Sequence, residues 1–237
     1  MFNHVYDTHA LNQKESMKLF DKEFTAAIFD MDGTLIDSTS LWHDIDKAFF
    51  SKRNMELPND YAQHIVHLGL TEAAKYTKNT YHLEESVQDI MDEWHQMSLD
   101  MYKYNVQLKE GALELLELFK KNGIKMAIAT ANDEELYRPC IERLGIEKYF
   151  DKIADVNTTK EGKQSAKIYL DLADALLSKP ENTLVLEDMP TCVKTAFKSG
   201  FITVAIYDHA SRAYEEEKRK YSHLYVKSFY ELVETIK

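Results

Sequence analysis

The stretch FDMDGTLIDS, residues 29–38, is the strongest indication of the fold because it joins an apolar strand to a turn that carries two carboxylates. The strand is the run TAAIF at residues 25–29, and Asp30 and Asp32 follow it two residues apart. Ligands of open α/β sheets bind at the carboxyl ends of strands, so both carboxylates can face such a crevice. An EF-hand calcium loop is excluded, because its glycine is sixth whereas Gly33 is fourth. A solvated acidic turn stays open as the alternative.

Similar short apolar runs recur along the chain and predict further strands. They lie at residues 124–130, 152–156, 183–187 and 202–206, with a weaker one at 224–229. Amphipathic helical patterns lie among them, at residues 112–121, 134–144, 165–177 and 191–199. Strands that are apolar throughout and alternate with helices are typical of a parallel sheet covered on both faces. The sequence therefore predicts an α/β fold.

The alternation of strands and helices is interrupted once, between the first strand and the second. Residues 38–107 show only helical patterns, of which residues 86–104 are the clearest because their apolar side chains fall on one helix face. We expect a helical cap domain at 38–107, inserted into a core domain formed by residues 1–37 and 108–237. Residues 1–24 precede every predicted strand and are interpreted as an N-terminal extension, with helical tendency and no assigned function.

The charge, cysteine content and hydropathy of the chain bear on its binding partners and its location. The formal net charge is −11, which disfavours nucleic acids and anionic membrane surfaces as partners. Cys140 and Cys192 have no metal-ligand spacing and are interpreted as free thiols in a reducing compartment. There is no apolar run of membrane-spanning length and no signal peptide, so we expect a cytoplasmic protein.

Polar residues also follow other predicted strands, at the same edge of the sheet. Thr130, Ala131 and Asn132 offer a hydroxyl, an amide and backbone N–H groups that can hold an anion at a helix start. Glu187 and Asp188 add carboxylates, and together with the carboxylates after the first strand they form an oxygen-rich site that suits Mg²⁺. Lys163 is a candidate cation for a phosphate group.

These motifs resemble the haloacid dehalogenase (HAD) superfamily, in its β-phosphoglucomutase-like branch. The segments that carry the resemblance are FDMDGTLIDS (29–38), IAT (128–130), GK (162–163) and LVLEDMPTCVKTAFKSG (184–200), with connecting segments at 108–123 and 143–151. The resemblance extends from about residue 25 to 207. It implies a Rossmann-like HAD core and a helical cap.

The resemblance implies catalytic roles for the first two carboxylates. Asp30 would attack phosphorus and carry an aspartyl-phosphate. Asp32 would protonate the leaving oxygen and then activate water. Dehalogenases of the superfamily carry tyrosine in place of Asp32, and phosphonatases carry alanine, so Asp32 favours phosphate esters.

The resemblance also implies a metal site and a phosphate site. Asp30, the backbone carbonyl of Asp32, and Asp188 would bind Mg²⁺, and Glu187 would act directly or through a metal-bound water. The phosphoryl oxygens would be held by residues that follow the second strand and by one lysine: Thr130, Ala131, Asn132 and Lys163.

Two departures from the family pattern leave alternatives open. The family usually continues its lysine with Pro-Ala-Pro-Asp, whereas residues 164–167 read QSAK, so Lys160 and Lys167 stay alternatives to Lys163. Cys192 stands where glycine is common, and we interpret it as a packing variation rather than a reactive thiol.

A cap loop separates the possible reactions. Mutases of this branch usually carry an arginine there for a second phosphate, and residues 67–73 (HLGLTEA) have none. We therefore predict a Mg²⁺-dependent phosphatase that hydrolyses a small phosphorylated metabolite, with a sugar-phosphate mutase as the alternative. A non-catalytic HAD-like binding module is the rival from another class, and loss of the carboxylates, all of which are present, would have indicated it.

Overall fold

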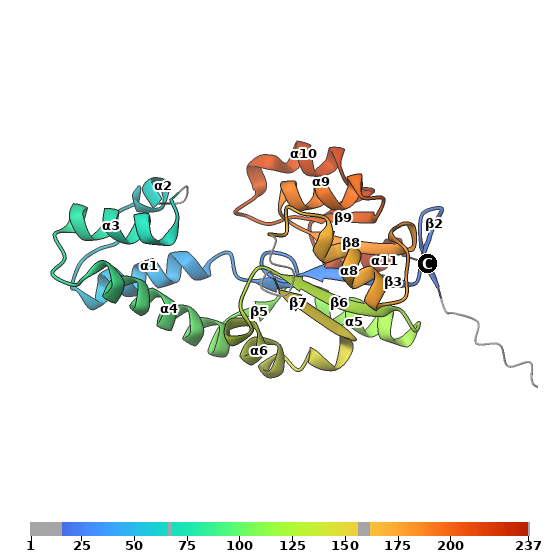
Figure 1. The fold of residues 1–237 in the computed structure, drawn as a ribbon, viewed down its shortest axis with the longest axis horizontal. Coiled ribbons are helices and arrows are strands. Elements are labelled where there is room, and N and C mark those ends of the chain that lie inside the picture. Colours follow the sequence, from blue (N-terminus) through green and yellow to red (C-terminus); the bar gives the residue numbers. More distant parts are fainter. Residues whose placement is uncertain (1–15, 66–67, 156–161, 237) are drawn as a thin grey trace, which may run out of the picture.

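A six-stranded parallel sheet forms the centre of the larger part of the protein (Figure 1). The computed structural model describes residues 16–65, 68–155 and 162–236. The strand order is β10-β9-β8-β3-β6-β7, and every neighbouring pair is parallel. The strands are β3 (Ala26–Asp30), β6 (Lys125–Thr130), β7 (Lys152–Asp155), β8 (Thr183–Glu187), β9 (Ile202–Ile206) and β10 (Leu224–Val226). The predicted α/β fold is thereby confirmed, with β3 in the middle of the sheet.

The two faces of the sheet are covered by different helices. Successive strand residues point to opposite faces, and in β3 Ala27 and Phe29 pack with α5, α6 and α11, whereas Ala26 and Ile28 pack with α8 and α9. Burial on both faces explains why these strands are apolar throughout. The covering helices are α5 (Ala112–Lys121), α6 (Glu134–Arg143), α8 (Lys167–Ala175), α9 (Pro190–Lys198) and α11 (Phe229–Thr235).

The inserted segment is helical, as predicted, and extends away from the sheet (Figure 1). It contains α1 (Leu41–Lys52), α2 (Tyr61–Ile65), α3 (Leu70–Tyr81) and α4 (Val87–Tyr104). Aromatic pairs hold it together: Phe49 lies 5.5 Å from Trp94, and Phe50 lies 4.9 Å from Tyr81, between ring centroids. A short antiparallel pair, β4 (Ile36–Asp37) with β5 (Gln107–Leu108), joins the two ends of the segment. The domain boundaries themselves stay a prediction.

The N-terminal extension differs from its predicted helical tendency. Residues 17–24 form an antiparallel hairpin of β1 (Met17–Leu19) and β2 (Lys22–Phe24), so the prediction is wrong for these residues. Leu19 and Phe24 are fully buried against the core, and this packing compensates for strands of only three residues. Residues 1–15 lie outside the described part of the chain.

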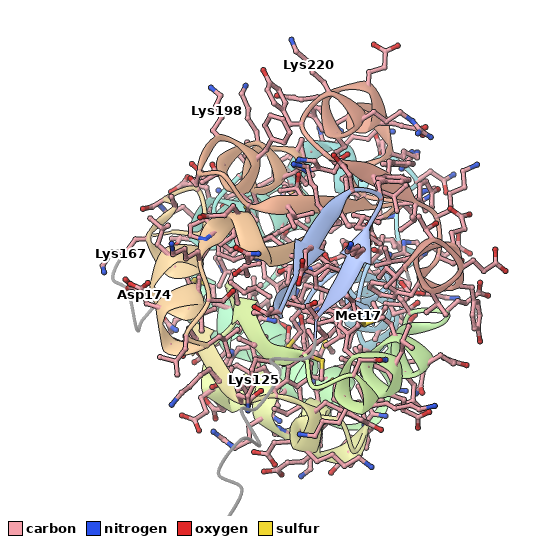
Figure 2. All side chains as sticks on the ribbon, turned by 90° about the vertical axis from the view of Figure 1, so that its right-hand side faces the viewer. Met17, Lys125, Lys167, Asp174, Lys198 and Lys220 are labelled. Atoms are coloured by element: carbon pink, nitrogen blue, oxygen red, sulfur yellow. The ribbon has the colours of Figure 1, made fainter. Side chains whose placement is uncertain are left out.

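The charged run at residues 215–220 is only partly a solvated helix face. It forms α10 (Glu215–Lys220), and Figure 2 shows Lys220 pointing outward, as does Lys198 at the end of α9. Lys218, by contrast, is fully buried, and its Nζ donates to the Ile206 carbonyl at 3.0 Å and to Ser211 Oγ at 2.9 Å. Among the described helices, none is long and apolar enough to cross a membrane.

Candidate active site

Three neighbouring strands end in the polar residues that the sequence singled out. Asp30 is the last residue of β3, which lies between β6 and β8 in the sheet. Thr130 and Glu187 are the last residues of those two neighbours. Because the strands are parallel and in register, all three side chains reach the same edge of the sheet.

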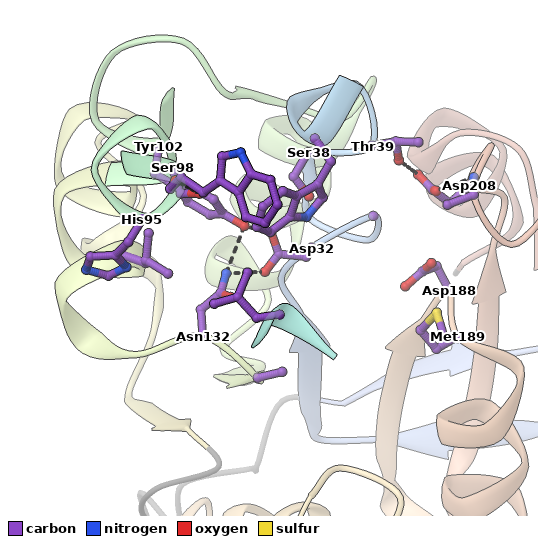
Figure 3. Close-up of a pocket in the computed structure, with 17 residues that line it drawn as sticks. Asp32, Ser38, Thr39, His95, Ser98, Tyr102, Asn132, Asp188, Met189 and Asp208 are labelled. Atoms are coloured by element: carbon purple, nitrogen blue, oxygen red, sulfur yellow. Dashed lines mark hydrogen bonds between the residues drawn. The ribbon is translucent and has the colours of Figure 1, made fainter. Parts of the chain in front are cut away.

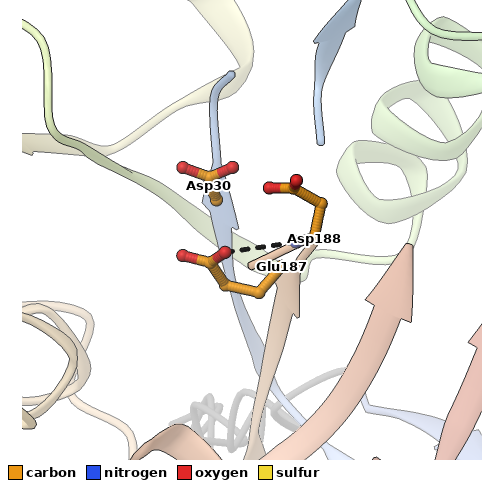
Figure 4. A group of neighbouring side chains, drawn as sticks. All are labelled: Asp30, Glu187 and Asp188. Atoms are coloured by element: carbon orange, nitrogen blue, oxygen red, sulfur yellow. Dashed lines mark hydrogen bonds between the residues drawn. The ribbon is translucent and has the colours of Figure 1, made fainter. Parts of the chain in front are cut away.

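Asp30, Glu187 and Asp188 form a buried acidic cluster (Figure 4). Each offers one carboxylate oxygen, and these three oxygens lie within 4.8 Å of one another. Burial, together with the charges of Asp30, Glu187 and Asp208, raises the pKa of Asp188 to about 8. Among the described residues, Asp30 Oδ2 is buried and has no hydrogen-bond partner. A dense, all-oxygen, partly unsatisfied site of this kind fits Mg²⁺.

Lys163 is the buried cation beside this cluster. Its Nζ contacts Asp30 Oδ1 and lies 2.6 Å from Glu187 Oε1. Burial alone would lower the pKa of Lys163, but the two carboxylates outweigh burial and raise it, so the side chain stays charged. Lys167 is exposed and pairs with Asp171 at 2.7 Å, away from the cluster, and Lys160 lies outside the described residues.

Glu187 is held on both of its oxygens. Oε1 accepts from the Tyr169 hydroxyl at 2.8 Å in addition to its contact with Lys163. Oε2 accepts from the backbone N–H groups of Asp188, at 3.1 Å, and Met189, at 3.3 Å. With both oxygens engaged, Glu187 is better placed to orient Lys163 and the loop after β8 than to bind a metal directly.

The Asp32 side chain is turned toward Tyr102 and Asn132 and away from Asp188 (Figure 3). Its Oδ1 accepts from the Tyr102 hydroxyl, and its Oδ2 accepts from Asn132 Nδ2 at 2.6 Å. Burial is the main cause that raises the pKa of Asp32 to about 6, although the Tyr102 hydrogen bond opposes it. Gly33 turns the chain next, at φ +75°, and a Cβ there would lie 2.9 Å from Asp188 Oδ2, so both the backbone and the space require glycine.

The predicted phosphate-binding residues at the end of β6 and in the loop that follows it have different surroundings. Thr130 is fully buried, and its Oγ1 accepts from the Asn132 backbone N–H at 3.1 Å. Ala131 and Asn132 line a cavity, and the Asn132 amide is turned toward Asp32. The structure thus joins Asn132 to the second carboxylate, a link that the sequence does not reveal.

A cavity of about 500 Å³ opens between the sheet edge and the inserted helices (Figure 3). Asp32, Asp188 and Asp208 contribute carboxylates to its wall. Aromatic and apolar side chains from the inserted helices and from the core form another part of the wall: Trp42, Leu70, Trp94, Tyr102, Leu136 and Met189. Uncharged polar groups and one histidine also line it: Ser38, Thr39, His95, Ser98 and Asn132. Among the described residues that line the cavity, none is a lysine or an arginine.

Asp208 and Ser211 belong to the site, and the sequence analysis missed both. Asp208 accepts from Lys109 Nζ at 2.6 Å and from the Thr39 hydroxyl, and these bonds lower its pKa despite burial. Ser211 donates to Asp188 Oδ2 at 3.3 Å. Asp208 could have been predicted from the sequence, because it lies two residues after the strand at 202–206, and other site residues likewise lie at or just after the ends of strands.

Comparison with known proteins assigns the fold to a family. A family model described as haloacid dehalogenase-like hydrolase matches residues 27–206, which include every site residue predicted from the sequence but neither Asp208 nor Ser211. The chain belongs to this family. The predicted resemblance to the HAD superfamily is therefore confirmed.

Relatives of this HAD-family chain include named phosphatases. A phosphorylated carbohydrates phosphatase of Thermotoga maritima is 27% identical over 175 residues, which are 74% of this chain and 81% of the relative. Hexitol phosphatase B of Escherichia coli is 26% identical over 174 residues, 70% of this chain and 76% of the relative. A solved Thermotoga maritima structure, assigned provisionally as a β-phosphoglucomutase, has a TM-score of 0.76 at 24% identity and covers 86% of this chain and 94% of its own. At that identity the likeness shows the fold alone.

Cys192 lies beside the site but has the properties of a packed thiol. It is buried and free, like Cys140. Burial and the charge of Glu187 raise the pKa of the Cys192 thiol to about 12. Because the thiolate is the reactive form, the raised pKa disfavours reactivity of Cys192 at neutral pH.

Proposed function

We propose that this protein is a Mg²⁺-dependent phosphatase that hydrolyses a small phosphorylated metabolite through an aspartyl-phosphate on Asp30. The observation that carries the proposal is the setting of Asp30. One of its carboxylate oxygens is held by Lys163, and the other is buried without a partner among the described residues. Such an oxygen is oriented and available as a nucleophile.

The reaction follows from the side chains around this carboxylate. Asp30 attacks phosphorus, the bond from phosphorus to the leaving oxygen breaks, and Asp32 donates a proton to that oxygen. Water then attacks the aspartyl-phosphate, Asp32 accepts a proton from the water, and the bond between phosphorus and Asp30 breaks. Inorganic phosphate leaves and both carboxyl groups return to their starting states. Lys163 and Thr130 hold the phosphoryl oxygens.

The acidic cluster is the proposed metal site. Asp30, Asp188 and the backbone carbonyl of Asp32 would hold Mg²⁺, with Glu187 acting through a water. When bound, the metal supplies positive charge that offsets the repulsion between the carboxylates and a phosphate anion. One carboxylate oxygen from each of Asp30, Glu187 and Asp188 lies within 4.8 Å of the other two, and this grouping supports the assignment.

The cavity supports a substrate with one phosphate and an uncharged remainder. Its described wall has aromatic and apolar surfaces and three carboxylates, but no lysine or arginine that could hold a second phosphate. Two of the named relatives are a phosphorylated carbohydrates phosphatase and a hexitol phosphatase, while others are named as pyrophosphatases. We infer that a phosphorylated sugar or polyol is the substrate class, and that the cytoplasm is where the protein acts. The presence of every carboxylate disfavours the non-catalytic binding module.

The test is Asp30→Asn, assayed with p-nitrophenyl phosphate and Mg²⁺. Loss of the nucleophile should lower turnover at least about a thousandfold while the protein stays folded. Asp37→Asn is the matched control, because it makes the same change on an exposed side chain seven positions along the same segment and should leave turnover unchanged. Retained activity in folded Asp30→Asn protein would contradict the proposed mechanism.

A further inference from the structure

Tyr102 reaches Asp32 from the last turn of α4, at the junction between the inserted helices and the core. Its hydroxyl donates to Asp32 Oδ1 and accepts from Asn132 Nδ2 at 2.9 Å, while the same amide donates to Asp32 Oδ2. The three side chains close a triangle of hydrogen bonds (Figure 3). Its corners come from α4 and from the loops that follow β3 and β6.

The position of Tyr102 is fixed by the core rather than by the triangle alone. The side chain is buried, with 6% of the residue exposed. Arg143 at the end of α6 donates to the backbone carbonyl of Tyr102 at 3.3 Å and also to that of Val106. The last turn of α4 is therefore attached to a core helix, and the hydroxyl is held at Asp32 without cost in side-chain freedom at the moment of reaction.

Tyr102 and Asn132 differ in whether they can both donate a hydrogen bond to Asp32 and accept one from it. A general acid and base must exist both as a carboxylate and as a carboxylic acid. The Asn132 amide can only donate to Asp32 through its nitrogen, which suits the carboxylate. A tyrosine hydroxyl can donate to the carboxylate or, by rotating, accept from the acid. Tyr102 can thus keep a hydrogen bond to Asp32 in both states.

We propose that Tyr102 is the positioning residue of Asp32, orienting its carboxyl group in the cavity for proton transfer to and from the substrate. This inference rests on the proposed function, in which Asp32 is the general acid and base. Its consequence concerns the leaving group. Poor leaving groups depend on the proton that Asp32 supplies, whereas good ones depart with little assistance.

The experiment compares two aryl phosphates of nearly the same shape, phenyl phosphate and p-nitrophenyl phosphate. Tyr102→Phe should lower kcat/KM for phenyl phosphate by about tenfold, a fraction of the roughly hundredfold or more that general acid catalysis contributes. The value for p-nitrophenyl phosphate, whose leaving group is far better, should change by less than about threefold, because its departure depends little on the acid. Tyr104→Phe is the matched control, since Tyr104 is exposed two residues along the same helix, and it should change neither value.

Two further variants separate the possible failures. Asp32→Asn should show the same selective loss more strongly, and equal effects on both substrates would overturn the role of Asp32 and with it the proposed mechanism. If Asp32→Asn is selective but Tyr102→Phe lowers both substrates equally or changes neither, the positioning role is wrong and the phosphatase stands. Should Tyr102→Phe fail to fold, Asn132→Ala tests the triangle from its other corner, with the ratio of the two kcat/KM values as the readout. An unchanged ratio there would equally reject the inference.

Discussion

Asp188 is a buried carboxylate of the proposed metal site, and its charged form requires a nearby cation. It is 3% exposed, and it accepts from the hydroxyls of Thr34, at 3.4 Å, and Ser211, at 3.3 Å. Neither donor is charged, and Lys218, which favours the charged form, is outweighed by burial and by neighbouring carboxylates, so a bound cation would be needed to keep Asp188 a carboxylate at neutral pH. Asp188→Ala should therefore raise the Mg²⁺ concentration needed for half-maximal activity by about tenfold or more, in the range seen for altered metal sites. Mg²⁺ should also raise the melting temperature of the wild type more than that of the variant.

The control for Asp188 is Asp174→Ala, which removes an exposed carboxylate from α8 and should change neither measurement. Calcium should inhibit the wild type, because its larger and looser coordination sphere displaces the nucleophile. Full activity of the wild type in excess chelator would contradict the metal site altogether.

The residues of the site differ in how far the sequence could predict them. Asp30, Thr130 and Glu187 end strands, and a strand end is recognisable from an apolar run that stops. Tyr102 could not be found in this way, because its place at Asp32 depends on how the last turn of α4 packs against α6. The roles assigned to Asp30, Thr130 and Glu187 stay predictions, but the order of the parallel strands itself brings these residues together.

The helix α4 begins with a capping box that can be tested separately from catalysis. Ser86 Oγ accepts from the Asp89 backbone N–H at 3.1 Å, and the Asp89 carboxylate accepts from the Ser86 backbone N–H at 2.9 Å. Ser86→Ala should lower the free energy of unfolding by about 1 kcal/mol, the usual worth of such a cap. Urea unfolding measures this change, and Ser51→Ala, on the exposed surface of α1, should remain within about 0.5 kcal/mol of the wild type.

Ser86→Ala also tests whether the cap at the start of α4 affects catalysis at Tyr102, near the other end of the helix. The helix has 18 residues and is about 27 Å long, so its cap lies far from Tyr102. The folded Ser86→Ala protein should keep the kcat of the wild type. An unchanged unfolding free energy would mean that the capping box contributes nothing here, and a lowered kcat would mean that the whole helix moves with its cap.

Elements were predictable in proportion to their length and apolar content. The six core strands and the helices between them follow from runs that are buried on both faces. The hairpin of residues 17–24 was missed because each strand has three residues, MKL and KEF, with polar positions among them. Its turn uses Phe20 at φ 56° rather than a glycine or asparagine, so it lacks the usual sequence signal. The pair β4 and β5, with two residues each, is likewise too short to predict.

Across the protein as a whole, the net charge opposes the binding of an anionic substrate, whereas Lys163 places a positive charge beside Asp30. The net charge is −11, and a phosphate anion gains nothing from the general field of the protein. The cavity wall adds three carboxylates, and Lys163 is the cation found at Asp30. Attraction must therefore come from contacts made inside the site, with the metal and Lys163 together.

This arrangement bears on the choice between phosphatase and mutase. A mutase holds a bisphosphate and needs a second cation in the cap, ideally a bidentate arginine. Lys75 and Lys78 lie close in sequence to the loop at residues 67–73. His67, the first residue of that loop, lies outside the described residues. Lys75 pairs with Glu72 at 2.7 Å, and Lys78 donates to backbone carbonyls, that of Leu83 at 2.9 Å among them. Neither lines the cavity.

We therefore predict that water, rather than a second sugar hydroxyl, attacks the aspartyl-phosphate. The protein should release inorganic phosphate in proportion to the substrate consumed and should need no sugar bisphosphate for activity. The measurement is incubation with β-glucose 1-phosphate and a glucose bisphosphate primer, followed by assay of glucose 6-phosphate and free phosphate. Asp30→Asn serves as the control, because both reactions begin on Asp30 and the variant should form neither product. Rapid formation of glucose 6-phosphate with little free phosphate would reverse the choice, because the cap would then have to bind a distal phosphate although none of the described residues that line the cavity is a lysine or an arginine.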